Sequence, residues 1–96
     1  MAPSSTQFFA VVEALESVPC LRSEDTRVLV LDQLRPAISG SVRHHPQRRA
    51  QMISLLRTCL DYHDGVNELL TAITNVEQDG SVPLQRLMDL LRGNDL

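Results

Sequence analysis

Hydrophobic residues recur every three or four positions along most of the chain, which is the spacing that gives a helix one apolar face. The pattern is clearest in four segments, at about residues 6–18, 46–63, 66–76 and 83–92. Their apolar positions are, in order, Phe8, Val11, Val12 and Leu15; Met52, Ile53, Leu56, Cys59 and Leu60; Val66, Leu69, Leu70, Ile73 and Val76; and Leu84, Leu87, Met88 and Leu91. Each of these segments is predicted to be a helix.

A further helix is predicted after Ser23, which can cap its first turn. Glu24 and Asp25 would lie in that turn and complement the positive end of the helix dipole. The apolar run at residues 28–31 would also suit a strand. We assign it to the helix because Leu34 continues the helical spacing and no other segment offers a partner strand.

Proline and glycine set the expected helix limits. Pro19 ends the first helix, and Pro46 and Pro83 begin two others, because a first helical turn does not need the missing N–H. Asp64-Gly65 ends the longest helix, and we expect Gly65 to take the left-handed conformation there.

The connections between these helices are short. Cys20 is expected in a loop after Pro19, and residues 79–81 (Asp-Gly-Ser) in a turn. A short helix can open at Pro36, but Gly40 weakens it, so an irregular segment is the alternative for residues 36–42.

The fold class predicted from these elements is all-α, a compact bundle of five to six short antiparallel helices. Residues 6–92 would form this single domain. Residues 1–5 are expected to be a disordered tail, and residues 93–96 a C-terminal tail or the start of a linker.

Four apolar side chains fall outside the apolar stripes: Leu29, Leu55, Tyr62 and Leu90. Most helices of such a bundle touch two or three others, so burial is the expected fate of each. Tyr62 is the best candidate for an exposed anchor in a protein contact, because its ring binds at low entropic cost.

Length and composition limit the class of protein. Ninety-six residues fit one compact domain, and a hydrophobic content of 43% argues against disorder. The N-terminus lacks the basic start and the apolar stretch of an export signal, and no run approaches the roughly 20 apolar residues of a membrane span. We therefore expect a cytoplasmic protein in which Cys20 and Cys59 are reduced.

Cys59 and His63 are the strongest candidates for chemistry, because a spacing of four places them on one helix face, as in a metal-binding pair. His44 and His45 could add ligands. We favour instead a buried Cys59 and a His63 that complements a helix C-terminus, because the chain has no CxxC or HxxxH pair to meet them. The four glycines form no phosphate-binding loop. No enzymatic activity, metal, cofactor or small-molecule substrate is expected.

The charges are distributed unevenly along the chain. Residues 33–60 carry five arginines and no acidic residue, a charge of +5, whereas the remainder carries four arginines against twelve acidic residues, a charge of −8. The basic set is Arg35, Arg43, Arg48, Arg49 and Arg57, and the acidic set is Glu13, Glu16, Glu68, Glu77 and Asp79. Separate regions of opposite charge would favour head-to-tail contacts between like copies or docking on a related domain. Solvated faces that segregate by chance are the alternative.

Eight residues follow from this pattern as candidates for a protein interface: Arg43, Arg48, Arg49, Arg57, Tyr62, Glu13, Glu16 and Glu68.

The order of residues also resembles a known family. The telling segments are Val18-Pro19-Cys20-Leu21-Arg22, which leads into Thr26-Arg27, and Leu56-Arg57-Thr58-Cys59-Leu60, which leads into Gly65. Together with the stretches FFAVVEALESVPCLRSEDTRVLVLDQL and PAISGSVRHHPQRRAQMISLLRTCLDYHDGVNELLTAI, they resemble the effector-associated domain of the second type over about residues 7–92.

This resemblance implies a death-like six-helix bundle that serves as an adaptor in bacterial conflict or immune signalling systems. Family members are typically fused to effectors or regulators such as peptidases, TIR domains or NTPases, and a like domain on a second protein is thought to bring effector and sensor together. The implied partner is another protein that carries a like domain, including a second copy of this chain. The resemblance also implies that the segment at residues 19–22 shapes the first connection between helices.

A helix-turn-helix-like regulator that binds nucleic acid through the arginines of residues 35–57 is the alternative. The net charge of −3 and the absence of lysine count against it. Neither nucleic acid nor a membrane is therefore the expected partner.

Overall fold

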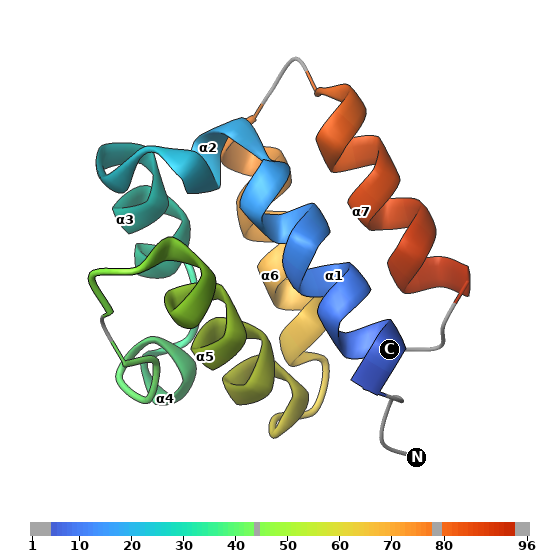
Figure 1. Ribbon diagram of the computed structural model, residues 1–96. Helices are drawn as coiled ribbons and strands as arrows, with labels where there is room; N and C mark the ends of the chain where they lie inside the picture. The colour runs from blue at the N-terminus through green and yellow to red at the C-terminus, as the bar shows by residue number, and fades with distance from the viewer. Residues whose placement is uncertain (1–4, 44, 78–79, 94–96) are drawn as a thin grey trace.

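The computed structural model describes residues 5–43, 45–77 and 80–93. In these ranges the chain forms seven helices and no strand (Figure 1). The helices are α1 (Ser5–Ser17), α2 (Pro19–Arg22), α3 (Glu24–Asp32), α4 (Pro36–Ser39), α5 (Arg48–Leu60), α6 (Gly65–Val76) and α7 (Val82–Gly93). The predicted all-helical bundle is confirmed. The short helix predicted at Pro36 is present as α4, and the number of helices exceeds the predicted five to six because of α2, a single turn where a loop was predicted.

Helix α1 is the centre of the bundle. It packs against α7 on one side and α5 on the other, and Figure 1 shows α1 and α7 side by side and running in opposite directions. Helix α6 packs on α5 and α3, and α3 also packs on α2. None of the helices in the described ranges is long and apolar enough to cross a membrane.

The core consists mainly of the predicted apolar stripes. From each long helix, side chains are fully or almost fully buried: Val11, Val12 and Leu15 of α1, Met52, Leu56 and Cys59 of α5, Leu69 and Ile73 of α6, and Leu84, Leu87 and Leu91 of α7. Leu55 is also fully buried, as expected for a helix with two neighbours, and Tyr62 and Leu90 are half-buried against the core. The expected burial of Leu29 is wrong, because its side chain is 53% exposed.

The single-turn helix α2 corrects the predicted loop at Cys20. The Cys20 side chain is buried, and its backbone N–H donates to Oε1 of Glu77 at 3.0 Å. The free carbonyls of this short helix are satisfied from α3, because the Thr26 hydroxyl donates to the Cys20 carbonyl at 2.6 Å and the Arg27 guanidinium donates to the Leu21 carbonyl at 3.1 Å. Residues 18–22 and 26–27 therefore form one connected polar joint between α1 and α3.

The turn between α5 and α6 corrects the expected role of Gly65. The left-handed residue is Asp64, at φ 57° and ψ 16°, and Gly65 is the first residue of α6. A Cβ atom at Gly65 would overlap the carbonyl oxygen of Cys59, so the position needs glycine for close approach of two backbones. Helix α5 begins two residues after Pro46 and ends at Leu60, three residues before the predicted limit.

Candidate functional site: a charged groove between three helices

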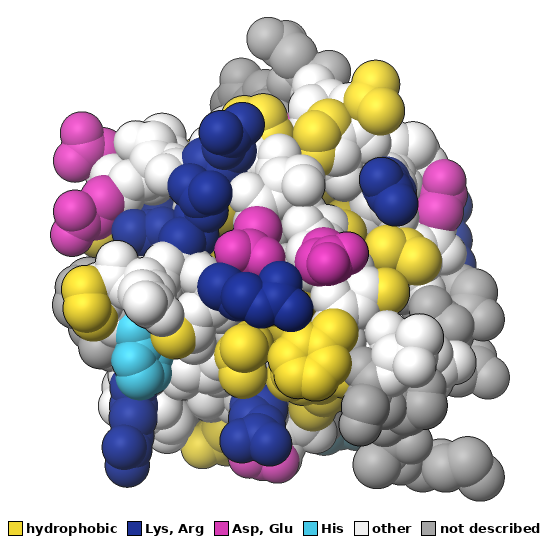
Figure 2. Space-filling model, viewed as in Figure 1, with side chains coloured by type: hydrophobic (Ala, Val, Ile, Leu, Met, Phe, Trp, Pro, Cys, Tyr) yellow, Lys and Arg dark blue, Asp and Glu magenta, His cyan; other side chains and the backbone are white. Residues whose placement is uncertain are grey.

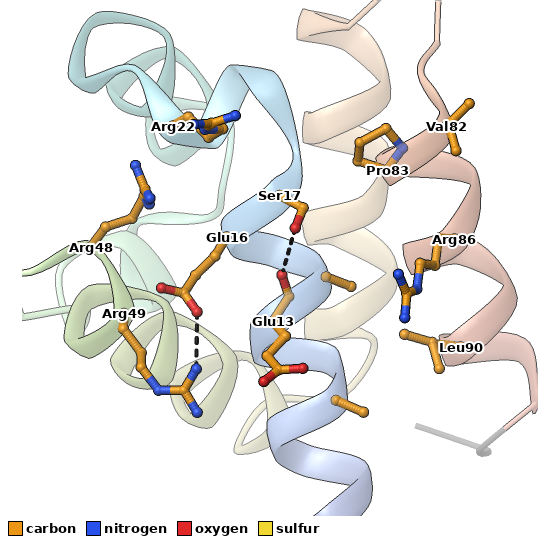
Figure 3. A pocket seen from close by; sticks show the side chains of 12 residues that line it. Glu13, Glu16, Ser17, Arg22, Arg48, Arg49, Val82, Pro83, Arg86 and Leu90 are labelled. Carbon is orange, nitrogen blue, oxygen red and sulfur yellow. Dashed lines mark hydrogen bonds and ion pairs between the residues drawn. The ribbon is translucent and has the colours of Figure 1, made fainter.

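A groove of about 770 Å³ runs between α1, α5 and α7, and it gathers charged side chains from these three helices and from the end of α2 (Figure 3). We call it the charged groove. Its walls are Ala10, Glu13, Ala14, Glu16, Ser17, Arg22, Arg48, Arg49, Val82, Pro83, Arg86 and Leu90. Four of the eight predicted interface residues therefore lie together here, although they come from two helices that are far apart in the sequence.

One ion pair crosses the groove between α1 and α5. The Arg49 guanidinium donates to Oε2 of Glu16 at 3.1 Å, and it also lies 5.5 Å from the centre of the Phe9 ring. The Phe9 ring in turn meets the edge of Phe8. Arg49 is therefore committed to contacts within the molecule, and its charge is largely neutralised by Glu16.

The other charges of the groove have no such partner. The side chains of Glu13, Arg22, Arg48 and Arg86 are exposed, and within the described part of the chain these side chains make no hydrogen bond or ion pair. Figure 3 shows Arg86 on the side of α7 that faces α1, Glu13 in front of α1, and Arg22 and Arg48 on the side of α1 away from α7. Charges of both signs are thus left free for another molecule.

An apolar side chain stands at the rim of the same groove. Val82, the first residue of α7, is 83% exposed, the largest value among the exposed hydrophobic residues. Pro83 is half-buried next to it, and Leu90 is half-buried about two turns further along α7. The groove therefore combines charged walls with apolar surface that is open to water.

Two other predicted residues, Arg43 and Arg57, lie in a separate cleft of about 500 Å³ along α5. The Arg43 backbone N–H donates to the Ser54 hydroxyl at 3.1 Å, which fixes the segment before α5 against that helix. Both arginine side chains are exposed, and His45 and Asp61 line the same cleft. These two arginines are therefore close to each other but are not part of the charged groove.

The last two predicted residues, Tyr62 and Glu68, take part in a cluster around Arg35, which we call the Arg35 corner. Arg35 donates from Nε to Oε2 of Glu68 at 2.8 Å and from its backbone N–H to Oε1, and its guanidinium also donates to the His63 carbonyl at 2.9 Å. The Tyr62 hydroxyl donates to the Ala37 carbonyl at 3.2 Å, beneath the Arg35 guanidinium.

The Arg35 corner ties the start of α4 to the turn between α5 and α6. The hydrogen bonds from Arg35 lower the pKa of Glu68 below its ordinary value, because they favour the ionised carboxylate. Glu68 and Tyr62 thus make contacts within the fold in this structure.

The expected division into a basic region and a separate acidic region does not hold at two places. Glu16 pairs with Arg49 and Glu68 pairs with Arg35, so acidic and basic side chains meet across helices. Glu77 accepts hydrogen bonds from the Cys20 backbone and the Ser81 hydroxyl. Asp79 lies outside the described residues.

The two thiols are buried and protonated. Burial, together with the nearby charge of Glu68, raises the pKa of Cys59 to about 12, and burial with the charge of Glu77 raises the pKa of Cys20 to about 11. The His63 side chain is almost fully exposed beside Asp64, so Cys59 and His63 do not face a common site. Within the described ranges, no group of three or more His, Cys, Asp or Glu side chains could hold a metal ion. His44 is outside those ranges.

Residues 12–92 match the family described as Effector-associated domain 2. The chain belongs to this family. The match runs from α1 to the last turn of α7, so it includes the polar joint at α2, the Arg35 corner and most of the charged groove. No curated protein and no solved structure matches the chain.

Sequence reasoning missed three wall residues of the groove in this effector-associated domain: Arg22, Val82 and Arg86. They come from α2 and α7, outside the basic segment at residues 33–60. The exposure of these three residues could be predicted, because they fall outside the apolar stripes of the helices. Nothing in the sequence, however, predicts that α7 lies beside α1. Their proximity is a property of the tertiary structure alone.

Proposed function

We propose that this domain is a non-enzymatic adaptor that docks onto another protein carrying a like domain. It would thereby couple an effector, such as a protease, a TIR protein or an NTPase, to a sensor in the cytoplasm of a bacterium, in a conflict or immune signalling system. Membership of the effector-associated domain 2 family supports this role. The observation that carries the proposal is the charged groove, where free charges of both signs line the same hollow as an exposed apolar residue at its rim.

Such a surface suits specific docking between proteins. Complementary charges speed association and exclude partners with the wrong charge pattern, while burial of an apolar side chain adds affinity. The free side chains Glu13, Arg48 and Arg86 can meet a partner without first breaking an ion pair within this domain.

Titration calorimetry tests the proposal directly. The chain is mixed with other proteins of the same genome that match the same family, and binding is measured for the wild type and for Arg48→Glu/Arg86→Glu. We expect at least one like domain to bind, and we expect the double variant to weaken binding about tenfold or more, because like charges are then opposed in the contact.

Arg43→Glu/Arg57→Glu is the matched control, because it makes the same change of charge in the cleft along α5. If only this control weakens binding, the docking surface lies on α5 and not in the charged groove. If no like domain binds the wild-type chain, the adaptor proposal is wrong.

No observation favours the nucleic-acid alternative. Two of the five arginines in the basic segment, Arg35 and Arg49, are paired with glutamates, and the remaining arginines are divided between the charged groove and the cleft along α5. A nucleic-acid surface would instead need a continuous basic stripe.

A further inference from the structure

We infer that two copies of this domain associate head to tail, with the exposed face of α3 from one copy seated in the charged groove of the next. This inference rests on the proposed docking function and names the two surfaces that would meet. It commits to a second copy of this chain as the occupant of the groove.

Helix α3 carries an exposed face on which two apolar residues lie between two acids. Asp25, Val28, Leu29 and Asp32 are spaced i, i+3, i+4 and i+7, so they follow one another along a single side of the helix. Val28 is 48% and Leu29 53% exposed. We call these four residues the α3 ridge; from Asp25 to Asp32 it spans about 10 Å along the helix axis.

The α3 ridge has no partner inside the described part of the molecule. Helix α3 packs on α2 and α6 through its opposite side, where Arg27 and Val30 are buried. Neither Asp25 nor Asp32 makes an ion pair or a side-chain hydrogen bond with a described residue. Adjacent exposed Val and Leu side chains flanked by free carboxylates form a surface that a protein contact would cover.

The charged groove offers the complementary pattern. It holds four arginines and two glutamates, and the Glu16–Arg49 pair leaves Arg22, Arg48 and Arg86 in excess over Glu13. The apolar rim around Val82 can receive Val28 and Leu29, while the free guanidinium groups can pair with the carboxylates at the two ends of the ridge. The groove thus offers both the apolar surface and the free guanidinium groups that the α3 ridge would need.

The α3 ridge and the charged groove are different surfaces, and both are exposed to solvent in a single copy of the domain. Helices α3 and α7 lie at opposite edges of the bundle, and acidic side chains stand at the α3 edge in the space-filling view (Figures 1 and 2). A contact between unlike surfaces leaves one free ridge and one free groove on every dimer, so further copies can add. Association would therefore continue beyond the dimer and bring several attached effectors together.

Sedimentation velocity with two complementary variants tests this inference. The ridge variant is Asp25→Arg/Asp32→Arg and the groove variant is Arg48→Glu/Arg86→Glu. All four side chains are exposed and unpaired, so the fold should survive, as circular dichroism would show. Asp25→Arg loses a favourable charge in the first turn of α3, so a small loss of stability is expected for the ridge variant. We expect the wild type to associate at concentrations up to about 1 mM, and each variant alone to associate at least about tenfold more weakly. Arg43→Glu/Arg57→Glu, the control outside the groove, should associate like the wild type.

The decisive measurement is the equimolar mixture of the two variants. The wild-type groove of one variant meets the wild-type ridge of the other, and the two reversed surfaces are also complementary, so mixing should restore association. A contact of groove with groove would instead leave the ridge variant fully associated on its own, and this result would overturn the inference.

The outcomes also separate this inference from the proposed function. A wild type that stays monomeric up to about 1 mM overturns the head-to-tail contact, while binding to like domains of other proteins, measured separately, would still support the adaptor role. If the wild type associates and neither variant changes it, docking between copies stands but these two surfaces are wrong.

Discussion

The Arg35 corner and the charged groove use the same residue types for opposite purposes. In the corner, the charges of Arg35 and Glu68 are satisfied within the chain, and the Tyr62 hydroxyl has a backbone acceptor. In the groove, only Glu16 and Arg49 are paired, and the other charges have no partner in the described part of the chain.

The difference shows that residue type and sequence position do not decide what a surface charge does. Glu13 and Glu68 are equal candidates for an interface in the sequence, but only the Glu13 carboxylate is left without a partner in the described part of the chain. Changes in the Arg35 corner should therefore lower stability and leave docking intact, whereas changes in the groove should do the reverse.

The largest effect is expected for Gly65→Ala at the turn beside the corner. The added methyl group would overlap the Cys59 carbonyl, so α5 and α6 must move apart, at a cost of about 3 kcal/mol in the free energy of unfolding. Urea denaturation measures this loss. In Gly80→Ala only the backbone is strained, at φ 71° with no atom nearby, so a loss of about 1 kcal/mol is expected. Equal losses would refute the argument from close approach.

The next effect is a fall in stability at high pH that depends on Cys59. Because the pKa of this buried thiol is about 12, the unfolded thiol ionises first as pH rises above about 9. The free energy of unfolding should then fall by up to about 1.4 kcal/mol per pH unit from this group, and Cys59→Ala should remove that part of the slope. Identical slopes for the wild type and Cys59→Ala would show that the thiol is accessible when folded.

A smaller effect is expected for Glu68→Gln, because the Arg35–Glu68 pair is partly exposed. The folded pKa of Glu68 lies below its ordinary value of about 4.3, so the pair stabilises the fold fully above that pH and loses its contribution as pH falls through the lowered pKa. Glu68→Gln should therefore lower the Tm at pH 7, and the difference should vanish in strong acid. Glu13→Gln, which removes an unpaired carboxylate, should leave the Tm unchanged.

The smallest effect on stability is expected for Arg48→Glu. This side chain has no described partner, so the free energy of unfolding should change by less than about 0.5 kcal/mol. Chemical denaturation measures this value, and calorimetry on the same sample measures docking. A large loss of stability would mean that Arg48 supports the fold, and the contrast between groove and corner would fail.

Much of the fold could be predicted because the apolar residues of an amphipathic helix recur every three or four positions in the sequence. The apolar positions of α1, α5, α6 and α7 recur at helical steps, and these stripes are the buried faces. The single turn of α2 could not be predicted, because its four residues carry no periodic pattern and its stability depends on Thr26, Arg27 and Glu77.

The candidate site was predicted less well. The charge pattern identified Glu13, Glu16, Arg48 and Arg49, which meet in one groove, but it equally selected Tyr62 and Glu68, which are bonded inside the fold. Leu29 was recognised as lying off its stripe, and the expectation of burial failed because α3 has neighbours on only part of its surface.

The sequence alone thus determined the five longer helices, their apolar faces and the family, because each depends on residues close together in the chain. Only the tertiary structure decided which charges are paired. Arg35 and Glu68, like Glu16 and Arg49, are separated by 33 residues, and α7 meets α1 from the other end of the chain. A charge becomes available for docking only when folding leaves it without a neighbour of opposite sign, and that outcome depends on how the helices pack.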